Sequence, residues 1–198
     1  ELNRCSGCTA CMNSCPSGAI KMSEDNEGFK YPEIDENICI NCGICRNICP
    51  FHINYSKKFN LEIPLVYAVK NKNEEVRLSS SSGGVFTAIS DYVLDNNGAI
   101  YGAAFDKDLV VRHCKATNRY DRNKFKGSKY VQSDLGDIFI NVKLEIQKNK
   151  LVLFTGTPCQ TAGLRAFLKN KDYDNLVICD LVCHGAPSPR IWHDYISF

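Results

Sequence analysis

Along residues 65–198, short apolar runs alternate with longer segments in which apolar residues recur every three or four positions. Short runs bounded by turn residues indicate strands, and the longer periodic segments indicate amphipathic helices. The expected strands cover residues 65–70, 99–105, 109–116, 151–154 and 176–182, the last two of them buried. The expected helices follow the turn at 79–84 as far as about Asp95 and then cover 135–148, 158–169 and 189–198. This alternation predicts an α/β domain around a central, mixed sheet.

The first 50 residues carry eight of the twelve cysteines, in two copies of one pattern. Both copies read C-x2-C-x2-C-x3-C-P, the spacing that holds a pair of 4Fe-4S clusters in bacterial ferredoxins. The fourth cysteine of each run then binds the cluster of the other run. The expected first ligand set is Cys5, Cys8, Cys11 and Cys49. The expected second ligand set is Cys39, Cys42, Cys45 and Cys15.

Two other interpretations of these cysteines explain less of the pattern. Disulfide frameworks belong to oxidising compartments and to small secreted chains. A tetrahedral zinc ion takes four ligands, so the third cysteine of each run and the x3-C-P tail would have no role. Thiolate ligands to iron require reduced cysteines, which indicates a reducing compartment and therefore a cytoplasmic protein.

The cysteine runs and the apolar pattern divide the chain into two domains. Residues 1–56 form the expected ferredoxin domain, a ferredoxin-like α+β module with a return strand that starts near Ala19. The module has few apolar side chains, so cluster binding supplies much of its folding free energy. Residues 57–64 are the expected linker, and residues 65–198 are the expected second domain.

Composition and chain ends narrow the class of protein further. The formal charge of +2 is nearly neutral and gives no indication of a nucleic-acid partner. No run approaches the roughly 18 apolar residues of a membrane span, and no secretion signal precedes the first cysteines. The sequence begins at Glu1 without methionine and ends at Phe198 inside a predicted helix. We therefore expect a C-terminally truncated part of a longer polypeptide, with an incomplete second domain.

The main candidate for a functional segment in the second domain is the place where a strand ends and a helix begins, at Thr157, Pro158 and Cys159. Open α/β sheets bind ligands at such places. Thr157 suits the N-cap and Pro158 the first helical position, which leaves Cys159 in the first turn. The helix dipole there favours the thiolate, so Cys159 is a candidate iron ligand or catalytic redox group. A capped helix with an inert cysteine explains the same residues equally well.

Two further segments have the chemistry of a phosphate site. The serines at 79–82 with Gly83 and Gly84 open a helix and leave its first N–H groups accessible. Between Arg112 and Lys129 seven basic residues accompany one acid, and Lys129 lies two positions after a glycine. Ordinary turns and solvated basic loops are the alternatives for these segments.

The four cysteines outside the ferredoxin runs lie in different sequence environments. Cys179 lies within an apolar strand and is expected in the core, whereas Cys183 ends that strand beside His184. Cys159 and Cys183 are candidates for a third cluster, for which Cys114 is a weak additional ligand. The four histidines, His113 among them, lack zinc-like spacing.

Four segments in this order resemble the family of coenzyme F420 hydrogenase/dehydrogenase beta subunits with a fused two-cluster ferredoxin. They are the segment from Ser81 to Ala88, that from Gly127 to Val131, that from Thr155 to Gln160 with Gly163, Leu164 and Arg165, and that from Cys183 to Gly185. The resemblance implies a flavoprotein in which FAD relays electrons between iron–sulfur clusters and a two-electron partner. The residues it implies at the flavin are Ser82, Gly83, Gly84, Thr87 and Lys129. It also implies that Cys159 and Cys183 ligate a third 4Fe-4S cluster or lie near the flavin ring.

The sequence thus predicts an FAD- and iron–sulfur-dependent oxidoreductase that exchanges electrons with a redox partner protein or an external carrier. Its small-molecule substrate would be coenzyme F420 or another organic acceptor or donor. The main alternative is an electron-transfer subunit that serves a partner enzyme and has no substrate site. A regulatory iron–sulfur sensor is a third possibility.

Overall fold

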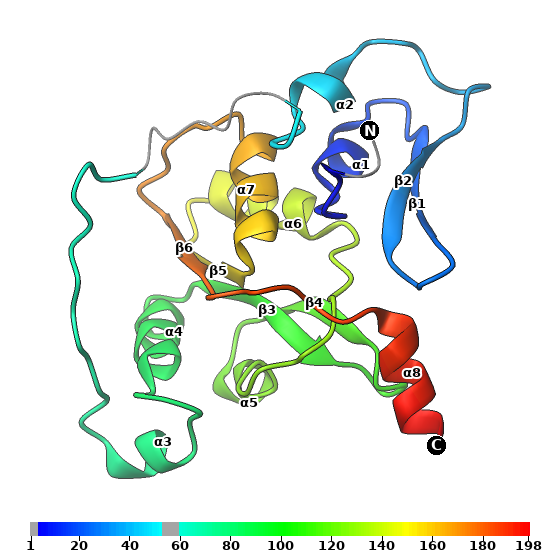
Figure 1. The fold of residues 1–198 in the computed structure, drawn as a ribbon. Coiled ribbons are helices and arrows are strands. Elements are labelled where there is room, and N and C mark those ends of the chain that lie inside the picture. The colour runs from blue at the N-terminus through cyan, green and yellow to red at the C-terminus, as the bar shows by residue number, and fades with distance from the viewer. Residues whose placement is uncertain (1–3, 53–59) are drawn as a thin grey trace.

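The structure, a computed structural model, describes residues 4–52 and 60–198. Figure 1 shows two parts, a small cysteine-bearing module above and a larger α/β domain below it. The module contains α1 (Ala10–Ser14), β1 (Ile20–Glu24), β2 (Lys30–Ile34) and α2 (Ile44–Asn47). The helices of the larger domain are α3 (Glu74–Leu78), α4 (Val85–Asp95), α5 (Arg119–Asn123), α6 (Ile138–Gln147), α7 (Pro158–Phe167) and α8 (Pro189–Ser197). Its strands are β3 (Ala99–Phe105), β4 (Val111–Ala116), β5 (Val152–Gly156) and β6 (Leu176–Asp180).

The module pairs two short helices with one hairpin. Strands β1 and β2 are antiparallel, with Ile20 opposite Ile34. Helices α1 and α2 each follow a residue in the left-handed conformation, Thr9 at φ 60° and Gly43 at φ 72°. These left-handed residues turn the chain within each cysteine run. The predicted α+β module with its return strand near Ala19 is confirmed in the described residues.

The central sheet of the larger domain has the strand order β4-β3-β5-β6. Strand β4 is antiparallel to β3, while β5 is parallel to both of its neighbours. The mixed sheet predicted from the sequence is therefore confirmed. Because β5 and β6 run in parallel, the segments that follow them emerge at the same edge of the sheet.

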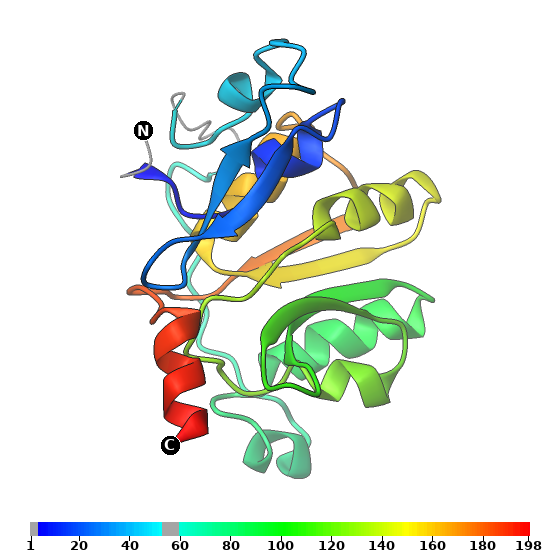
Figure 2. The same ribbon diagram turned by 90° about the vertical axis from the view of Figure 1, so that its right-hand side faces the viewer.

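Helices cover both faces of this sheet, as the two views in Figures 1 and 2 make clear. Helix α4 and the neighbouring α5 cover one face, where Val93 packs with Ile100 and Leu153. Helices α6 and α7 cover the other, where Phe139 and Phe154 are fully buried. The result is a three-layer domain, and the cysteine module lies on its α6 and α7 side.

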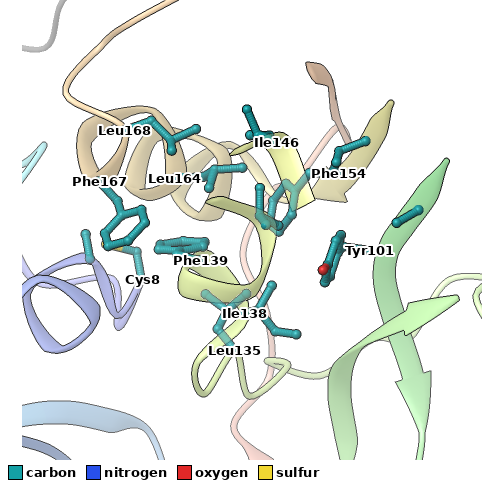
Figure 3. Packing of buried hydrophobic residues seen from close by; sticks show 14 residues of the cluster. Cys8, Tyr101, Leu135, Ile138, Phe139, Ile146, Phe154, Leu164, Phe167 and Leu168 are labelled. Atoms are coloured by element: carbon teal, nitrogen blue, oxygen red, sulfur yellow. The ribbon is translucent and has the colours of Figure 1, made fainter. Parts of the chain in front are cut away.

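The core on the α6 and α7 side extends into the cysteine module. Cys8 and Ala10 belong to the same buried cluster as Phe139, Leu164 and Phe167. Figure 3 shows Cys8 beside Phe167 and Phe139, at the end of a row of aromatic side chains that continues to Phe154. The two parts of the chain therefore share one hydrophobic core.

Two predicted strands differ from the structure. Residues 65–70 form no strand and lie exposed, with Val66 87% accessible, so the apolar run has no described partner to pair with. Strand β6 stops at Asp180 and is half-buried instead of buried, because β5 alone pairs with it among the described strands. Cys179 on this strand, expected in the core, is accordingly half-buried and packs against the edge of the cluster formed by Val93, Ile100 and Leu153.

Other boundaries agree with expectation to within a few residues. Helix α4 ends at Asp95, and Asn97 follows at φ 54°, the predicted left-handed stop. The five-residue helices α3 and α5 were not expected, because each rests on an asparagine N-cap and not on an apolar period. Of the predicted linker 57–64, residues 57–59 lie outside the described residues, and 60–64 form neither helix nor strand. None of the helices described is long and apolar enough to cross a membrane.

Candidate cluster-binding loops and the edge of the sheet

The first ligand set is drawn together from two distant parts of the sequence. Burial raises the pKa of the Cys8 thiol to about 11, and neighbouring Cys49 and Cys5 add to the rise. Burial also raises the pKa of Cys11 to about 12, with Cys8 and Cys49 among the contributors. Electrostatic influence of this kind requires proximity, so the last cysteine of the second run lies beside the first run. The crossed ligand sets that the spacing predicts are compatible with this proximity and stay a prediction.

The second ligand set lies closer to solvent. Cys42 is exposed, and Ile40 nearby is 64% accessible. The Cys15 sulfur accepts a hydrogen bond from the Ala19 backbone N–H at 3.3 Å and lies 3.7 Å from the Ser17 hydroxyl. Burial acts to raise the pKa of Cys15, but the hydrogen bonds from Ser17 and Ala19 outweigh it and lower that pKa. Such hydrogen bonds also stabilise a thiolate bound to iron.

The cysteines of the two donor sets are arranged for no single metal ion, and thiolates are the usual ligands of 4Fe-4S clusters. Across the described residues, no three Cys, His, Asp or Glu side chains converge closely enough to hold one metal ion. In a cubane each thiolate binds a different iron, so the four sulfurs lie further apart than the ligands of one ion. All eight thiols are free of disulfides. The free thiols and their spacing therefore suit the clusters predicted from the sequence.

Cys8 contacts the second domain directly, at Gly163 of α7. A Cβ atom placed on Gly163 would lie 2.9 Å from both the Cβ and the sulfur of Cys8. Real Cβ atoms do not approach other atoms this closely, so the glycine leaves the space that the cysteine fills. The first ligand set therefore rests on α7.

A second connection is made by residues 131–136, which we call the interdomain strap. Three hydrogen bonds join it to the cysteine module: Gln132 Nε2 to Ser6 O at 3.2 Å, Lys30 Nζ to Asp134 Oδ2 at 2.7 Å, and Asn13 Nδ2 to Gly136 O at 2.9 Å. The strap is anchored in turn to β4, where Arg112 pairs with Asp134 at 3.0 Å. It thus holds the loop of the first cysteine run against the sheet domain.

The strap also leads to the start of α7 through a buried histidine. His113 Nε2 lies 3.0 Å from the Thr155 carbonyl, which can only accept, so Nε2 carries the proton. His113 Nδ1 then accepts from the Ser133 hydroxyl at 2.9 Å, and Ser133 accepts from the Gln160 amide at 2.8 Å. The other end of Gln160 accepts from the Thr157 N–H at 3.0 Å. The network fixes the turn between β5 and α7 with every partner satisfied.

The predicted helix start after β5 is confirmed, with Thr157 at the N-cap and Pro158 in the first turn. Cys159 is half-buried, and its sulfur lies 3.1 Å from the Thr157 hydroxyl. Cys183, which follows β6 at the same edge, is exposed and accepts from the Gly185 N–H at 3.4 Å. Neither joins a three-residue metal group among the described residues. The roles predicted for both cysteines stay predictions.

The predicted flavin residues fall into two groups. Gly84 is the N-cap of α4 at φ 74° and brings no side chain to cap the helix, while Ser82 is exposed. Gly83 accepts from the Asn71 N–H at 2.6 Å, which holds the turn in place. The turn at 82–84 therefore offers backbone N–H groups that suit an anion.

The other two predicted flavin residues are engaged elsewhere in this structure. Thr87 is buried at 3% exposure. The Lys129 ammonium donates to the carbonyls of Lys124 at 2.8 Å and Lys126 at 2.9 Å, and burial lowers its pKa to about 8. A phosphate would have to compete with these carbonyls for Lys129.

Two cavities lie between the cysteine module and the second domain. One, of about 180 Å³, is lined by residues of β1, β2, the strap and α8, including Trp192. The other, of about 670 Å³, is lined by residues of α1, α2, α6 and α7, together with Ile48 and Lys169. Neither is lined by the predicted flavin residues.

Several residues of this arrangement were missed from the sequence. Gln132, Ser133 and Gln160 act through contacts with residues far away in the chain, and no local motif marks them. His113 has no metal-like spacing because it serves as a buried hydrogen-bonding group. A glycine in the middle of a predicted helix, Gly163, was the one sequence signal that could have indicated a close contact.

The His113 network predicts a dependence of stability on pH. Burial lowers the pKa of His113 from 6.5 to about 4. The pKa of His113 is lower in the folded than in the unfolded protein. The contribution of the neutral His113 to the free energy of unfolding is therefore complete above pH 6.5 and is lost as the pH falls towards 4. Between pH 7 and 5.5 we expect the free energy of unfolding to fall by about 1 kcal/mol and the apparent Tm by roughly 2–4 °C. This pH-dependent loss should be absent in His113→Gln. Anaerobic thermal unfolding at a fixed scan rate measures the apparent Tm at each pH. An equal dependence of Tm on pH in the wild type and in His113→Gln would contradict the prediction.

Comparisons with known proteins agree with both parts of this structure. Residues 4–53 match the model of the 4Fe-4S dicluster domain, and residues 149–198 match that of the C terminus of the coenzyme F420 hydrogenase/dehydrogenase beta subunit. The dicluster match contains all eight cysteines of the two ligand sets. The C-terminal match contains β5, α7, β6 and α8.

Two curated relatives extend over most of the chain. The chain is 30% identical over 168 residues to the "Coenzyme F420-dependent sulfite reductase" of Methanocaldococcus jannaschii, covering 81% of this chain and 24% of that protein. It is 23% identical over 189 residues to a subunit of the F(420)H(2) dehydrogenase of Methanosarcina mazei, covering 90% of this chain and 53% of that protein. The chain thus spans at most about half the length of either relative.

A solved structure shares the fold. In the F420-reducing NiFe hydrogenase complex from Methanosarcina barkeri, one chain superposes with a TM-score of 0.50 at 21% sequence identity. The match covers 65% of this chain and 47% of that one, and at this identity it concerns the fold alone. Taken with the two family matches, these relationships show that the chain is similar to coenzyme F420 hydrogenase/dehydrogenase beta subunits over residues 149–198 and to 4Fe-4S dicluster domains over residues 4–53.

Proposed function

We propose that the protein is an iron–sulfur flavoprotein oxidoreductase. It passes electrons between two 4Fe-4S clusters and FAD, and onward to a two-electron organic acceptor or donor, coenzyme F420 or another substrate. The observation that carries this proposal is the contact of Cys8 with Gly163, which builds the first ligand set into the core of the beta-subunit-like domain. A ferredoxin module that merely accompanied this domain would not need to share its core.

The residues that would hold the clusters are the eight cysteines of the two ligand sets. When bound, the clusters supply single electrons, and a flavin converts between single electrons and pairs. In the first ligand set the chain shields Cys8 from water, because Cys8 is 9% exposed and packs with Phe139 and Phe167. Around the second, the N–H of Ala19 holds the Cys15 sulfur.

For the flavin, the chain offers the turn at 82–84 at the start of α4. The residues that fit its phosphates are Ser82, Gly83 and Gly84, whose backbone N–H groups and small size suit an anion at a helix N-terminus. Lys129 would contribute only after leaving the carbonyls of Lys124 and Lys126. Cys159 and Cys183, at the edge of the sheet, are the proposed additional ligands or neighbours of the flavin ring.

A second function is favoured by the engagement of Lys129 and the burial of Thr87. In it the protein is an electron-transfer subunit that carries clusters for a partner enzyme and has no substrate site of its own. The names of its relatives include a dehydrogenase subunit and a hydrogenase complex, which is compatible with such a role. Both functions require a redox partner protein or an external carrier.

Cofactor counts separate the two functions. Anaerobic purification of the full-length protein followed by iron, sulfide and flavin assays should give about eight irons per chain, four for each cubane. One flavin per chain supports the flavoprotein, and its absence supports the electron-transfer subunit. About twelve irons would bring Cys159 and Cys183 into a third cluster. A protein without iron would refute both functions.

The crossed ligand assignment has its own test. Because Cys49 lies beside the first cysteine run, Cys49→Ser should remove or alter the first cluster and leave the second. Cys42→Ser should do the reverse, and Cys179→Ser, outside both sets and outside the candidate third cluster, should leave the iron content unchanged. Iron analysis and electron paramagnetic resonance (EPR) of the reduced proteins measure the effect. If Cys49→Ser and Cys42→Ser altered the same signal, the crossed assignment would be wrong.

A further inference from the structure

The environment of the first ligand set is supplied from outside the cysteine module. Cys8 touches α7 so closely that a Cβ on Gly163 would come within 2.9 Å of the cysteine sulfur and within 3.3 Å of its carbonyl oxygen. On this side the wall of the ligand loop is the backbone of a helix that belongs to the second domain.

The backbone of α7 does not itself require glycine at this position. Gly163 lies in the middle of the helix and is not among the residues with positive φ. Glycine in a helix interior costs roughly 0.5–1 kcal/mol relative to alanine. The neighbouring positions Ala162 and Leu164 are buried and do carry side chains. The contact with Cys8 explains the glycine, since any side chain would displace the cysteine.

The strap holds the same loop from its other side. Gln132 Nε2 donates to the Ser6 carbonyl at 3.2 Å, and it lies 3.1 Å from the place where a Cβ on Gly7 would stand. Gly7 at φ 67° also lies close to the Lys30 carbonyl, which a Cβ would approach to 2.7 Å. The residues between Cys5 and Cys8 are thus fixed between Gln132 and α7.

This enclosure distinguishes the two ligand sets. Cys8 is 9% exposed within an apolar cluster, whereas Cys42 is exposed near the 64% accessible Ile40. Solvent exposure and hydrogen bonds near the sulfurs are among the main determinants of a cluster's reduction potential. The two cysteine runs have the same spacing, but Cys8 is buried and Cys42 is exposed. The second domain creates this difference in exposure, because it covers Cys8.

Helix α7 also connects this contact to the edge of the sheet. Cys159 lies four residues before Gly163, one helical turn or about 6 Å along the axis. The His113 network fixes the same end of the helix through Gln160. If Cys8 moved along α7, the distance between Cys8 and the edge of the sheet where β5 and β6 end would therefore change.

We propose that Gly163 and Gln132 are positioning residues for the first ligand set, through which the second domain sets that cluster's environment. The inference rests on the proposed function only in requiring that the two ligand sets carry clusters. Gly163 acts by having no side chain, and Gln132 acts by holding the Ser6 carbonyl. Neither residue is an iron ligand.

The test uses the anaerobic holoprotein and two substitutions, Gly163→Ala and Gln132→Ala. The control is Ala162→Ser, which adds one heavy atom at the adjacent position of the same helix. Midpoint potentials from redox titration followed by EPR are the readout, with Cys49→Ser and Cys42→Ser identifying which signal belongs to which ligand set. We expect both substitutions to shift the potential or the signal of the first cluster and to leave the second unchanged.

Loss of iron is a second readout of the same experiment. Selective loss of about half of the iron in Gly163→Ala would support the inference in the same way as a shift. If Gly163→Ala failed to fold, Gln132→Ala would decide, because it removes atoms and adds none. Unchanged potentials and spectra in the variants, or equal changes in both clusters, would overturn the inference. A wild-type protein without clusters would instead refute the proposed function.

Discussion

The packing of the Cys8 loop onto α7 is the contact on which the arrangement of the two domains depends. Burying side chains as small as Cys8 and Ala10 is worth on the order of 1 kcal/mol each, at about 0.8 kcal/mol per CH2 group. Set against a total stability of about 5–15 kcal/mol, this energy is modest. The importance of the contact is therefore geometric: it fixes a ligand loop against the core of a sheet domain, where Gly163 leaves room for it.

The two cysteine runs have identical spacing but differ in how far the rest of the chain covers them. In the first run, Cys8 is enclosed by α7, the strap and the side chains of Phe139 and Phe167. The second run lies at the surface, where Cys42 is exposed. One side of the module is thus joined to the second domain and the other remains accessible. That polarity suits a module that receives or delivers electrons on its open side and exchanges them with the sheet domain on its closed side.

The sequence predicted best what depends on neighbouring residues. Cysteine spacing indicated the dicluster domain, Thr157 and Pro158 indicated the start of α7, and Asn97 indicated the end of α4. Prediction was wrong where burial depends on a partner, as for residues 65–70, which are apolar but have no strand beside them among the described residues. The contact between Cys8 and Gly163 joins positions 155 residues apart, and the Gln132 bond joins positions 126 apart. Local patterns carry no information on such pairs.

If the domains share one core, they should unfold together. The most direct measurement is thermal unfolding of the anaerobic holoprotein, with cluster absorbance followed beside the far-ultraviolet circular dichroism of the α/β domain. Because Cys8 packs with residues of α6 and α7, we expect the two signals to change in one coincident transition. Loss of all cluster absorbance well below the temperature at which the helices melt would contradict a shared core.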